Sequence, residues 1–257
     1  MKPSAEIEAR VSEEIRKAAD TLRNLDEDRL FDSPFVASAV YYHEGFLSNY
    51  PAEKKDADPS RRIIAAIVRL ITPAVKDKYL ALLNQRYAEQ VSQESDSRFY
   101  LPVTWEPPSK RRRRRRPTHQ YAIDLFTPEG SPVRAASRGV IILAESGWTA
   151  SDPFSTSSRL GGNTLIVVDP IAKRMYRYCH LESVLTSAGE IVQATQTIGA
   201  VGHTGINASR PRHGGHLHFE VNEYGDGEVR ALDYKQLLAM LTRAWSAGSV
   251  AAAGGGR

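Results

Sequence analysis

Six short apolar runs constrain the fold of this chain more than any other feature of its sequence. They are GVIILAE, NTLIVVD, MYRYCHL, EIVQA, TIGAVG and HLHFEV, and they begin between residues 139 and 216. The runs are rich in β-branched residues, and glycine, proline, asparagine and aspartate separate them, as is typical of strands joined by turns. The pattern predicts an all-β domain over residues 98–232.

The first 97 residues show a different periodicity. Apolar side chains recur at helical spacing at Ile7, Val11, Ile15, Ala18 and Leu22. A second stretch, residues 61–90, is typical of one or two helices interrupted at Pro73. We therefore predict an α-helical region over residues 1–97, in which no catalytic constellation is evident.

The C-terminal residues return to helical periodicity. We predict a helix over residues 233–247 and a flexible tail over residues 248–257, where alanine and glycine dominate. The chain as a whole is thus expected to be α+β, with helices before and after the β domain.

Histidines concentrate in HGGHLHFEV, which begins at His213. On a strand, His216 and His218 share one face, while Leu217 and Phe219 share the other. Two imidazoles on one face can converge on a zinc ion. The alternative is a half-buried strand whose polar face carries histidines without a metal.

The positive charge of the chain is local. The formal net charge is +4, but six arginines form one run from Arg111 to Arg116, and without them the balance would be negative. The overall charge is therefore poor evidence for a nucleic-acid-binding surface. The run itself either attracts an anionic polymer or is a solvated linker.

A single cysteine, Cys179, excludes an internal disulfide framework and a cysteine-rich zinc site. Any metal site in this chain must therefore use histidines and carboxylates. We expect Cys179 to act as a small buried apolar group.

The N-terminal residues are dense in charge and lack the apolar run of a secretory signal. No later segment reaches the roughly 18 apolar residues that a transmembrane helix needs. The sequence therefore predicts no transmembrane segment.

Five segments together carry a family resemblance. YAIDLFTPEGSPVRAASRGVI, GGNTLIVVD, YRYCHL, IGAVGHTG and HLHFEV resemble, in order and separation, the motifs of the lysostaphin-type, or LytM-domain, zinc metallopeptidases. The resemblance covers roughly residues 119 to 224. It implies a curved antiparallel β-sheet, one zinc ion, and an endopeptidase that acts on peptidoglycan peptides in the cell envelope or outside the cell.

The same resemblance implies the roles of five residues. His119, Asp124 and His218 would be the zinc ligands, and His180 and His216 would be the catalytic pair. Catalytic zinc generally has three protein ligands and an open fourth position for water. One histidine of the pair would accept and deliver the proton, and the other would stabilise the oxyanion; the sequence does not separate these roles.

His119 departs from the spacing common in the family, because it lies five rather than four residues before Asp124. On a regular strand an odd separation sends two side chains to opposite faces. We therefore expect a bend, a bulge, or a position for His119 in the preceding loop. His213 and His203 are the alternative ligands.

Several neighbours of these motifs have a structural interpretation beside a functional one. We expect Glu220 to be structural rather than a general base, and Gly161 and Gly162 to shape a turn. Tyr178 lies two positions from His180, so a regular strand would put both on one face, where Tyr178 lines the groove or packs in the core. The polar loop over residues 145–162 is expected to border the cleft.

An active zinc endopeptidase competes with a non-enzymatic module that uses the same groove to bind cell wall or to regulate another hydrolase. A binding-only relative would be expected to lack a ligand or catalytic position. Candidates for every position are present in this chain, which favours the enzyme.

Overall fold

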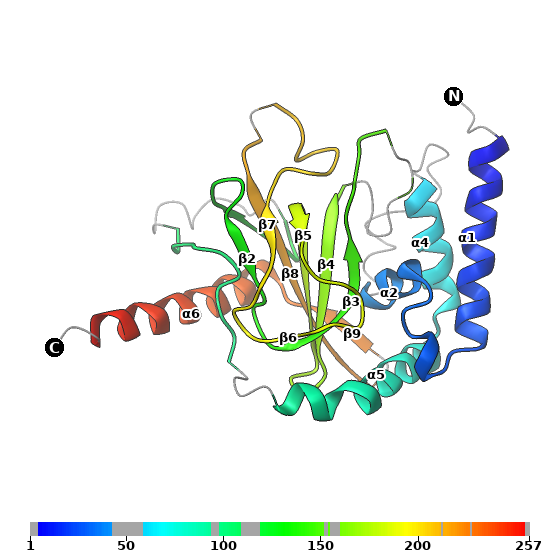
Figure 1. Cartoon of the computed structure of the whole chain (residues 1–257), viewed down its shortest axis with the longest axis horizontal. Coiled ribbons are helices and arrows are strands. Elements are labelled where there is room, and N and C mark those ends of the chain that lie inside the picture. The colour runs from blue at the N-terminus through cyan, green and yellow to red at the C-terminus, as the bar shows by residue number, and fades with distance from the viewer. Residues whose placement is uncertain are drawn as a thin grey trace.

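One antiparallel sheet forms the centre of the molecule, with helices gathered on one side of it and a further helix projecting from the other (Figure 1). The computed structural model describes residues 5–42, 59–93, 98–108, 119–151, 154, 160–211, 213–226 and 228–254. The predicted α+β class is confirmed, with a helical N-terminal region followed by a β-rich domain. The arginine run lies outside the described residues.

Most helices within the described residues coincide with predicted helical stretches, whereas the helix Pro34–Tyr41 was predicted only as part of the helical region over residues 1–97. The helices are α1 (Ala5–Arg23), α2 (Pro34–Tyr41), α4 (Pro59–Leu70), α5 (Pro73–Gln93) and α6 (Tyr234–Gly254), with a short 3-10 helix at Glu27–Arg29. The predicted interruption at Pro73 is confirmed, because α4 ends at Leu70 and Pro73 is the first residue of α5. Thr72 caps α5 by accepting a hydrogen bond from the Val75 N–H at 3.3 Å.

The C-terminal helix is longer than the sequence suggested. We expected it to end at residue 247 and a flexible tail to follow, but α6 runs to Gly254. Alanine has the highest helix propensity of any residue, and three consecutive alanines, 251–253, extend the last turns. Part of the expected tail is therefore helical.

Nine strands of the described residues form the sheet. They are β1 (Ile123–Phe126), β2 (Pro132–Arg134), β3 (Gly139–Glu145), β4 (Asn163–Asp169), β5 (Arg174–Val184), β6 (Ile191–Val192), β7 (Thr197–Val201), β8 (His216–Gly225) and β9 (Glu228–Ala231). The runs GVIILAE and NTLIVVD coincide with β3 and β4. The strands β1, β2 and β9, each of three or four residues, were not predicted as separate runs.

All strand pairs are antiparallel, and the main path through the sheet is β1-β8-β5-β4-β3-β6. β9 pairs with β8, and β7 joins β2 to β5. β1 and β5 therefore flank β8, although they lie far from it in sequence. This arrangement places β8, which carries His216 and His218, between the strand that carries Asp124 and the strand that carries His180.

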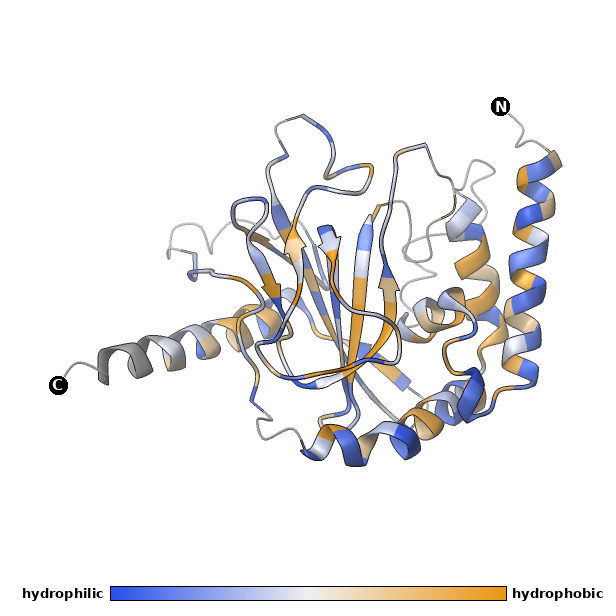
Figure 2. Cartoon of the chain, in the orientation of Figure 1, coloured by the Kyte–Doolittle hydropathy of each residue, from blue (hydrophilic) through white to orange (hydrophobic). Residues whose placement is uncertain are grey.

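Each face of the sheet packs into a separate apolar cluster, because side chains alternate along every strand. On β3 and β4, Val140, Ile142, Ile166 and Val168 join a cluster built with α1, α2, α4 and α5. On the same strands, Ile141, Leu165 and Val167 face the opposite cluster, which includes Leu237 and Leu241 of α6. Figure 2 shows apolar residues concentrated on the strands and on α4, whereas α1 is mostly hydrophilic.

The helical cluster crosses the boundary expected at residue 97. Fully buried residues of the helices, such as Val36, Ile67 and Leu83, belong to the same cluster as Ile166 of the sheet. The helices therefore cover part of one sheet face rather than forming a core of their own. Among the described residues, no helix combines the length and apolar character required to cross a bilayer.

A shared core predicts that a cavity in the helical region destabilises the sheet. We expect Leu83→Ala to lower the free energy of unfolding by about 2–5 kcal/mol, the usual range for a buried leucine. The measurement is urea unfolding followed by tryptophan fluorescence. All three tryptophans, Trp105, Trp148 and Trp245, lie outside the N-terminal helices and so report on the β domain and on α6.

Leu70→Ala is the matched control, because Leu70 is 44% exposed on α4 and its truncation should change stability by no more than about 0.5 kcal/mol. If Leu83→Ala moved the far-ultraviolet circular dichroism transition but left the fluorescence transition in place, the two regions would unfold separately. That result would contradict a shared core.

Candidate metal and catalytic site

The pairing of β1 with β8 brings together Asp124 and His218. These residues are direct cross-strand partners, so their side chains lie on the same face of the sheet. The His218 Nδ1 lies 2.9 Å from the Asp124 Oδ1. Both side chains are mostly buried, with 14% of His218 and 12% of Asp124 exposed.

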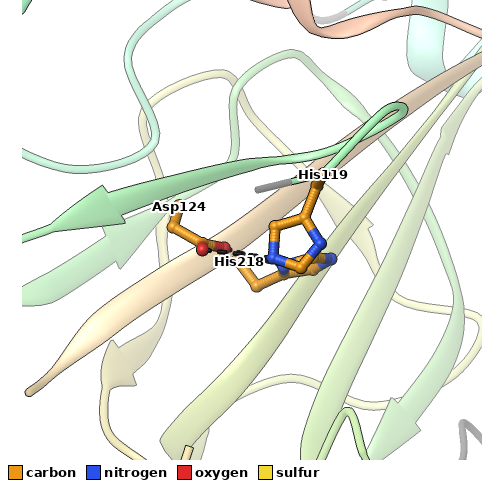
Figure 3. Close-up of side chains that lie close together, drawn as sticks. All are labelled: His119, Asp124 and His218. Atoms are coloured by element: carbon orange, nitrogen blue, oxygen red, sulfur yellow. Dashed lines mark hydrogen bonds and ion pairs between the residues drawn. The ribbon is translucent and has the colours of Figure 1, made fainter. Parts of the chain in front are cut away.

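His119 completes a cluster of three with Asp124 and His218. Its Nε2 lies 3.2 Å from the Asp124 Oδ2, and one ligand atom from each of the three residues lies within 4.8 Å of the others. Figure 3 shows His119 entering from the loop that precedes β1, while the other two side chains come from adjacent strands. The odd spacing between His119 and Asp124 is thus explained, because His119 lies outside the strand.

The loop that carries His119 is tied to the start of α6. The Tyr234 N–H donates a hydrogen bond to the Gln120 carbonyl at 2.8 Å. The His119 side chain is 43% exposed, so it lies on the solvent side of the cluster, whereas Asp124 and His218 lie on its buried side. Burial raises the pKa of Asp124, but hydrogen bonds from His119 and His218 outweigh it and keep the carboxylate ionised.

His218 lies between two carboxylates. Its Nε2 is 3.0 Å from the Glu220 Oε1, on the side opposite Asp124. Burial lowers the pKa of His218, but the hydrogen bonds to Asp124 and Glu220 prevail and raise it to about 9. In metal sites, a second carboxylate on the far ring nitrogen commonly orients a ligating histidine.

His180 adopts a backbone conformation that non-glycine residues rarely adopt, with a φ of 65°. Four residues of β5, Tyr178 to Leu181, lie opposite three residues of β4, Leu165 to Asn163, so β5 carries an extra residue. The His180 N–H donates to the Gly161 carbonyl at 2.8 Å, which braces the bulge.

Because of this bulge, the prediction that Tyr178 shares a sheet face with His180 is wrong. Regular alternation would put Tyr178 and His180 on one face, but the left-handed residue turns His180 to the site. Tyr178 is fully buried in the cluster on the opposite face, where its hydroxyl accepts a hydrogen bond from the Ala136 N–H at 2.9 Å. Tyr178 is thus a core residue and does not line the groove.

His180 and His216 lie side by side next to the cluster. Their ring centroids are 4.8 Å apart, and the His180 ring is 5.6 Å from that of His218. The Nδ1 of His180 is 2.7 Å from the Thr204 carbonyl, and the Nδ1 of His216 is 3.0 Å from the Gly214 carbonyl. Because a carbonyl only accepts hydrogen bonds, each Nδ1 carries a proton, and each Nε2 has a free lone pair in the neutral ring.

The environment favours the neutral form of both rings. Burial, together with the neighbouring His218 and His216, lowers the pKa of His180 to about 3. Burial also lowers the pKa of His216, although the Gly214 carbonyl opposes it. The structure thus places two imidazoles with lowered pKa values beside a group of two histidines and an aspartate.

Comparison with known families identifies the β domain. Residues 118–230 match the model of Peptidase family M23. The chain carries an M23 peptidase domain. The predicted lysostaphin-type resemblance is confirmed at the level of the family.

Curated relatives align with the M23 domain. Glycyl-glycine endopeptidase ALE-1 of Staphylococcus capitis is 34% identical over 102 residues, which cover 40% of this chain and 24% of that protein. Lysostaphin of Staphylococcus simulans is 32% identical over 112 residues, which cover 43% of this chain and 20% of lysostaphin. The chain thus spans a quarter or less of the length of these relatives.

Among solved structures, the antimicrobial peptidase lysostaphin from Staphylococcus simulans aligns with a TM-score of 0.35 and 26% identity. That alignment covers 56% of this chain and 49% of the lysostaphin chain.

The two alternative ligands lie outside the cluster of the M23 domain. His213 stacks against His216, with ring centroids 5.2 Å apart, and the His203 Nδ1 is 2.8 Å from the Glu129 Oε2. Within the described residues, the three-residue group that could hold a metal is His119, Asp124 and His218. Phe126, which is 63% exposed, lies beside His216 with ring centroids 5.3 Å apart.

Gly162 shapes the turn that holds His180 in place. Its φ is +64°, and a Cβ there would lie 2.4 Å from the Thr204 carbonyl carbon. Thr204 in turn accepts the His180 Nδ1–H through its carbonyl and bonds the Leu181 carbonyl through its hydroxyl at 2.9 Å. This part of the polar loop therefore borders the site, as expected, and supports it.

Glu220 lies closer to the candidate site than the sequence predicted, because it contacts His218. The sequence indicated a structural residue, and its position two residues after His218 on the same strand face was the signal for a closer role. Cys179 is buried, as predicted, and is the cross-strand partner of His218.

The left-handed conformation of His180 yields a prediction about stability. His180→Gly and His180→Ala remove the same imidazole, but glycine adopts a positive φ without steric strain. We expect the glycine variant to be more stable by about 1 kcal/mol, since the left-handed region destabilises other residues by 1–2 kcal/mol. The measurement is the free energy of unfolding in urea.

His216 provides the matched control, because it lies at the start of β8 with no positive φ. There we expect the order to reverse, with His216→Gly less stable than His216→Ala by about 0.5–1 kcal/mol. The same order at both positions would contradict the strained geometry of His180.

Proposed function

We propose that this chain is a zinc-dependent endopeptidase that hydrolyses peptide bonds of bacterial peptidoglycan. The observation that carries the proposal is the convergence of His119, Asp124 and His218 next to the paired rings of His180 and His216. The match of residues 118–230 to Peptidase family M23 supports the reaction class. The endopeptidase name of the relative from Staphylococcus capitis supports a peptide substrate with glycine.

The cluster fits zinc by the chemistry of its donors. His119 and His218 offer ring nitrogens and Asp124 offers a carboxylate oxygen, a set common in catalytic zinc sites. We propose that these three residues hold the metal. The chemistry that zinc supplies when bound is Lewis-acid polarisation of a peptide carbonyl and acidification of water.

The paired histidines have the geometry for proton transfer. With each Nδ1–H engaged by a backbone carbonyl, the Nε2 atoms of His180 and His216 are the ring atoms left for the reaction. We propose that one Nε2 accepts the proton of the attacking water and delivers it to the leaving amine. The other ring takes up a proton from solvent at its Nε2 as negative charge develops on the substrate carbonyl oxygen, and it then donates a hydrogen bond to the oxyanion.

Digestion of isolated peptidoglycan tests the reaction. We expect the purified chain to release fragments with new amino termini from cell wall, and mass spectrometry of the fragments identifies the bond. Two substrates are compared, one with glycine cross-bridges and one with directly linked stem peptides. A chelator should abolish release and added zinc should restore it, since the metal supplies the Lewis acid.

The His216→Ala variant, purified in the same way, is the control for contaminating hydrolases. Release that persists with the chelator, or that the variant shows equally, would contradict a metal-dependent peptidase. No release from either substrate, with zinc bound, would favour a binding module.

Substitution of His216 and of His218, the two histidines of HLH, should separate metal binding from turnover. We expect His218→Ala to lose bound zinc and activity, because it removes a proposed ligand. His216→Ala should retain stoichiometric zinc but lose activity by about 10²–10⁴-fold, the usual contribution of proton transfer. Elemental analysis and the rate of peptide cleavage are the two measurements. Equal loss of zinc in both variants would overturn this division of roles.

A further inference from the structure

The polar residues of β8 form a row on one sheet face. His216, His218, Glu220 and Asn222 alternate with Leu217, Phe219 and Val221, which are buried in the opposite cluster. Further along the row, Tyr224 belongs to the cluster shared with the helices. The proposed metal site and the helical region therefore occupy neighbouring parts of one face.

The end of α2 lies over the middle of this row. Tyr41, the last residue of α2, is 1% exposed, and its hydroxyl donates to the Glu220 Oε2 at 3.0 Å. The Asn222 side chain donates to the Tyr41 carbonyl at 2.7 Å. Lys76 of α5 donates to the carbonyl of the adjacent Tyr42 at 3.0 Å. The position of the Tyr41 ring is thus fixed from both the sheet and the helices.

Glu220 is held at both carboxylate oxygens. Its Oε2 accepts from Tyr41, and its Oε1 accepts from Arg177 Nη1 at 2.8 Å and lies 3.0 Å from the His218 Nε2. Arg177 is the cross-strand partner of Glu220 and is only 6% exposed. The guanidinium also lies within 6 Å of the ring centroids of Tyr41 and Tyr42, at 5.9 Å and 5.6 Å. Together these contacts hold the Glu220 carboxylate in a single orientation.

The orientation of the Glu220 carboxylate determines which ring nitrogen of His218 is available to a metal. With an ionised Glu220 as acceptor, the Nε2 carries the proton and the Nδ1 presents its lone pair. The Nδ1 is the atom that faces Asp124, at 2.9 Å from its Oδ1. The contact with Glu220 therefore aims His218 at the cluster.

We infer that Tyr41 of the helical region is a positioning residue for the metal ligand His218, acting through Glu220. This inference rests on the proposed function, because it takes His119, Asp124 and His218 as the metal ligands. The hydrogen bond from the Tyr41 hydroxyl fixes the orientation of the Glu220 carboxylate. The carboxylate in turn fixes the orientation of the His218 imidazole. The helices thereby complete the outer shell of a metal site that belongs to the β domain.

The zinc affinity of the chain over residues 1–257 tests this inference. Tyr41→Phe removes one oxygen atom and keeps the ring. We expect zinc affinity, measured by competition with a chromophoric chelator, to fall about tenfold or more, the lower end of the range for outer-shell residues. We also expect the absorption spectrum of the cobalt-substituted chain to shift, since the His218 ring is no longer held in one orientation.

Tyr79→Phe is the matched control. Tyr79 lies in α5, is fully buried, and donates its hydroxyl to the Leu30 carbonyl at 3.1 Å, far from Glu220 in the hydrogen-bond network. It loses the same buried oxygen and a hydrogen bond, so its stability should fall, but its zinc affinity and cobalt spectrum should match those of the unmodified chain. An equal loss of affinity in both variants would mean that the helices act only through general stability, and would overturn the inference.

A double-mutant cycle tests the path through Glu220. In a Glu220→Gln background, Tyr41→Phe should lower zinc affinity by much less than it does alone, because the linking carboxylate is gone. Additive losses would show that Tyr41 acts by another route. If the unmodified chain binds zinc and Tyr41→Phe binds it equally well, the inference fails and the proposed function stands. If the unmodified chain binds no zinc, both fail.

Discussion

The register between β1 and β8 is the constraint on which the proposed site depends. It sets Asp124 opposite His218, although 94 residues separate them. Because side chains alternate along a strand, a slip of one residue would exchange His218 for Leu217 or Phe219 on the polar face. The apolar partners of those two residues in the opposite cluster hold the register. Core packing on one face therefore determines the chemistry on the other.

The second constraint is a local departure from that alternation. His180 would point into the core if β5 were regular, since Tyr178, two positions before it, is buried there. The extra residue in β5 and the positive φ turn the ring toward His216 instead. Conformations of this kind are unfavourable by 1–3 kcal/mol and persist only where the surroundings enforce them. Here the bonds of His180 to Gly161 and Thr204 provide that enforcement.

The sequence predicted the parts of this structure that follow from local pattern. The β3 and β4 strands, the break at Pro73, and the shared face of His216 and His218 all depend on neighbouring residues. The expected end of the C-terminal helix is wrong because alanines with high helix propensity continue the helix to Gly254. The face of Tyr178 was wrong because a bulge depends on pairing with a second strand. The contact of Tyr41 with Glu220 spans 179 residues, and no local pattern could have indicated it.

The Arg177–Glu220 pair is difficult to explain by stability alone. Transferring two charges from water to the interior is unfavourable, and replacing a buried ion pair with apolar residues is often neutral or stabilising. On the neighbouring part of this face, apolar strand side chains such as Ile142 and Ile166 are buried against the helices, so the fold can bury apolar residues here. The charged pair instead lies where the helices end and the histidines begin, and its carboxylate contacts His218. Orientation of that imidazole accounts for a buried charge at this position, whereas packing does not.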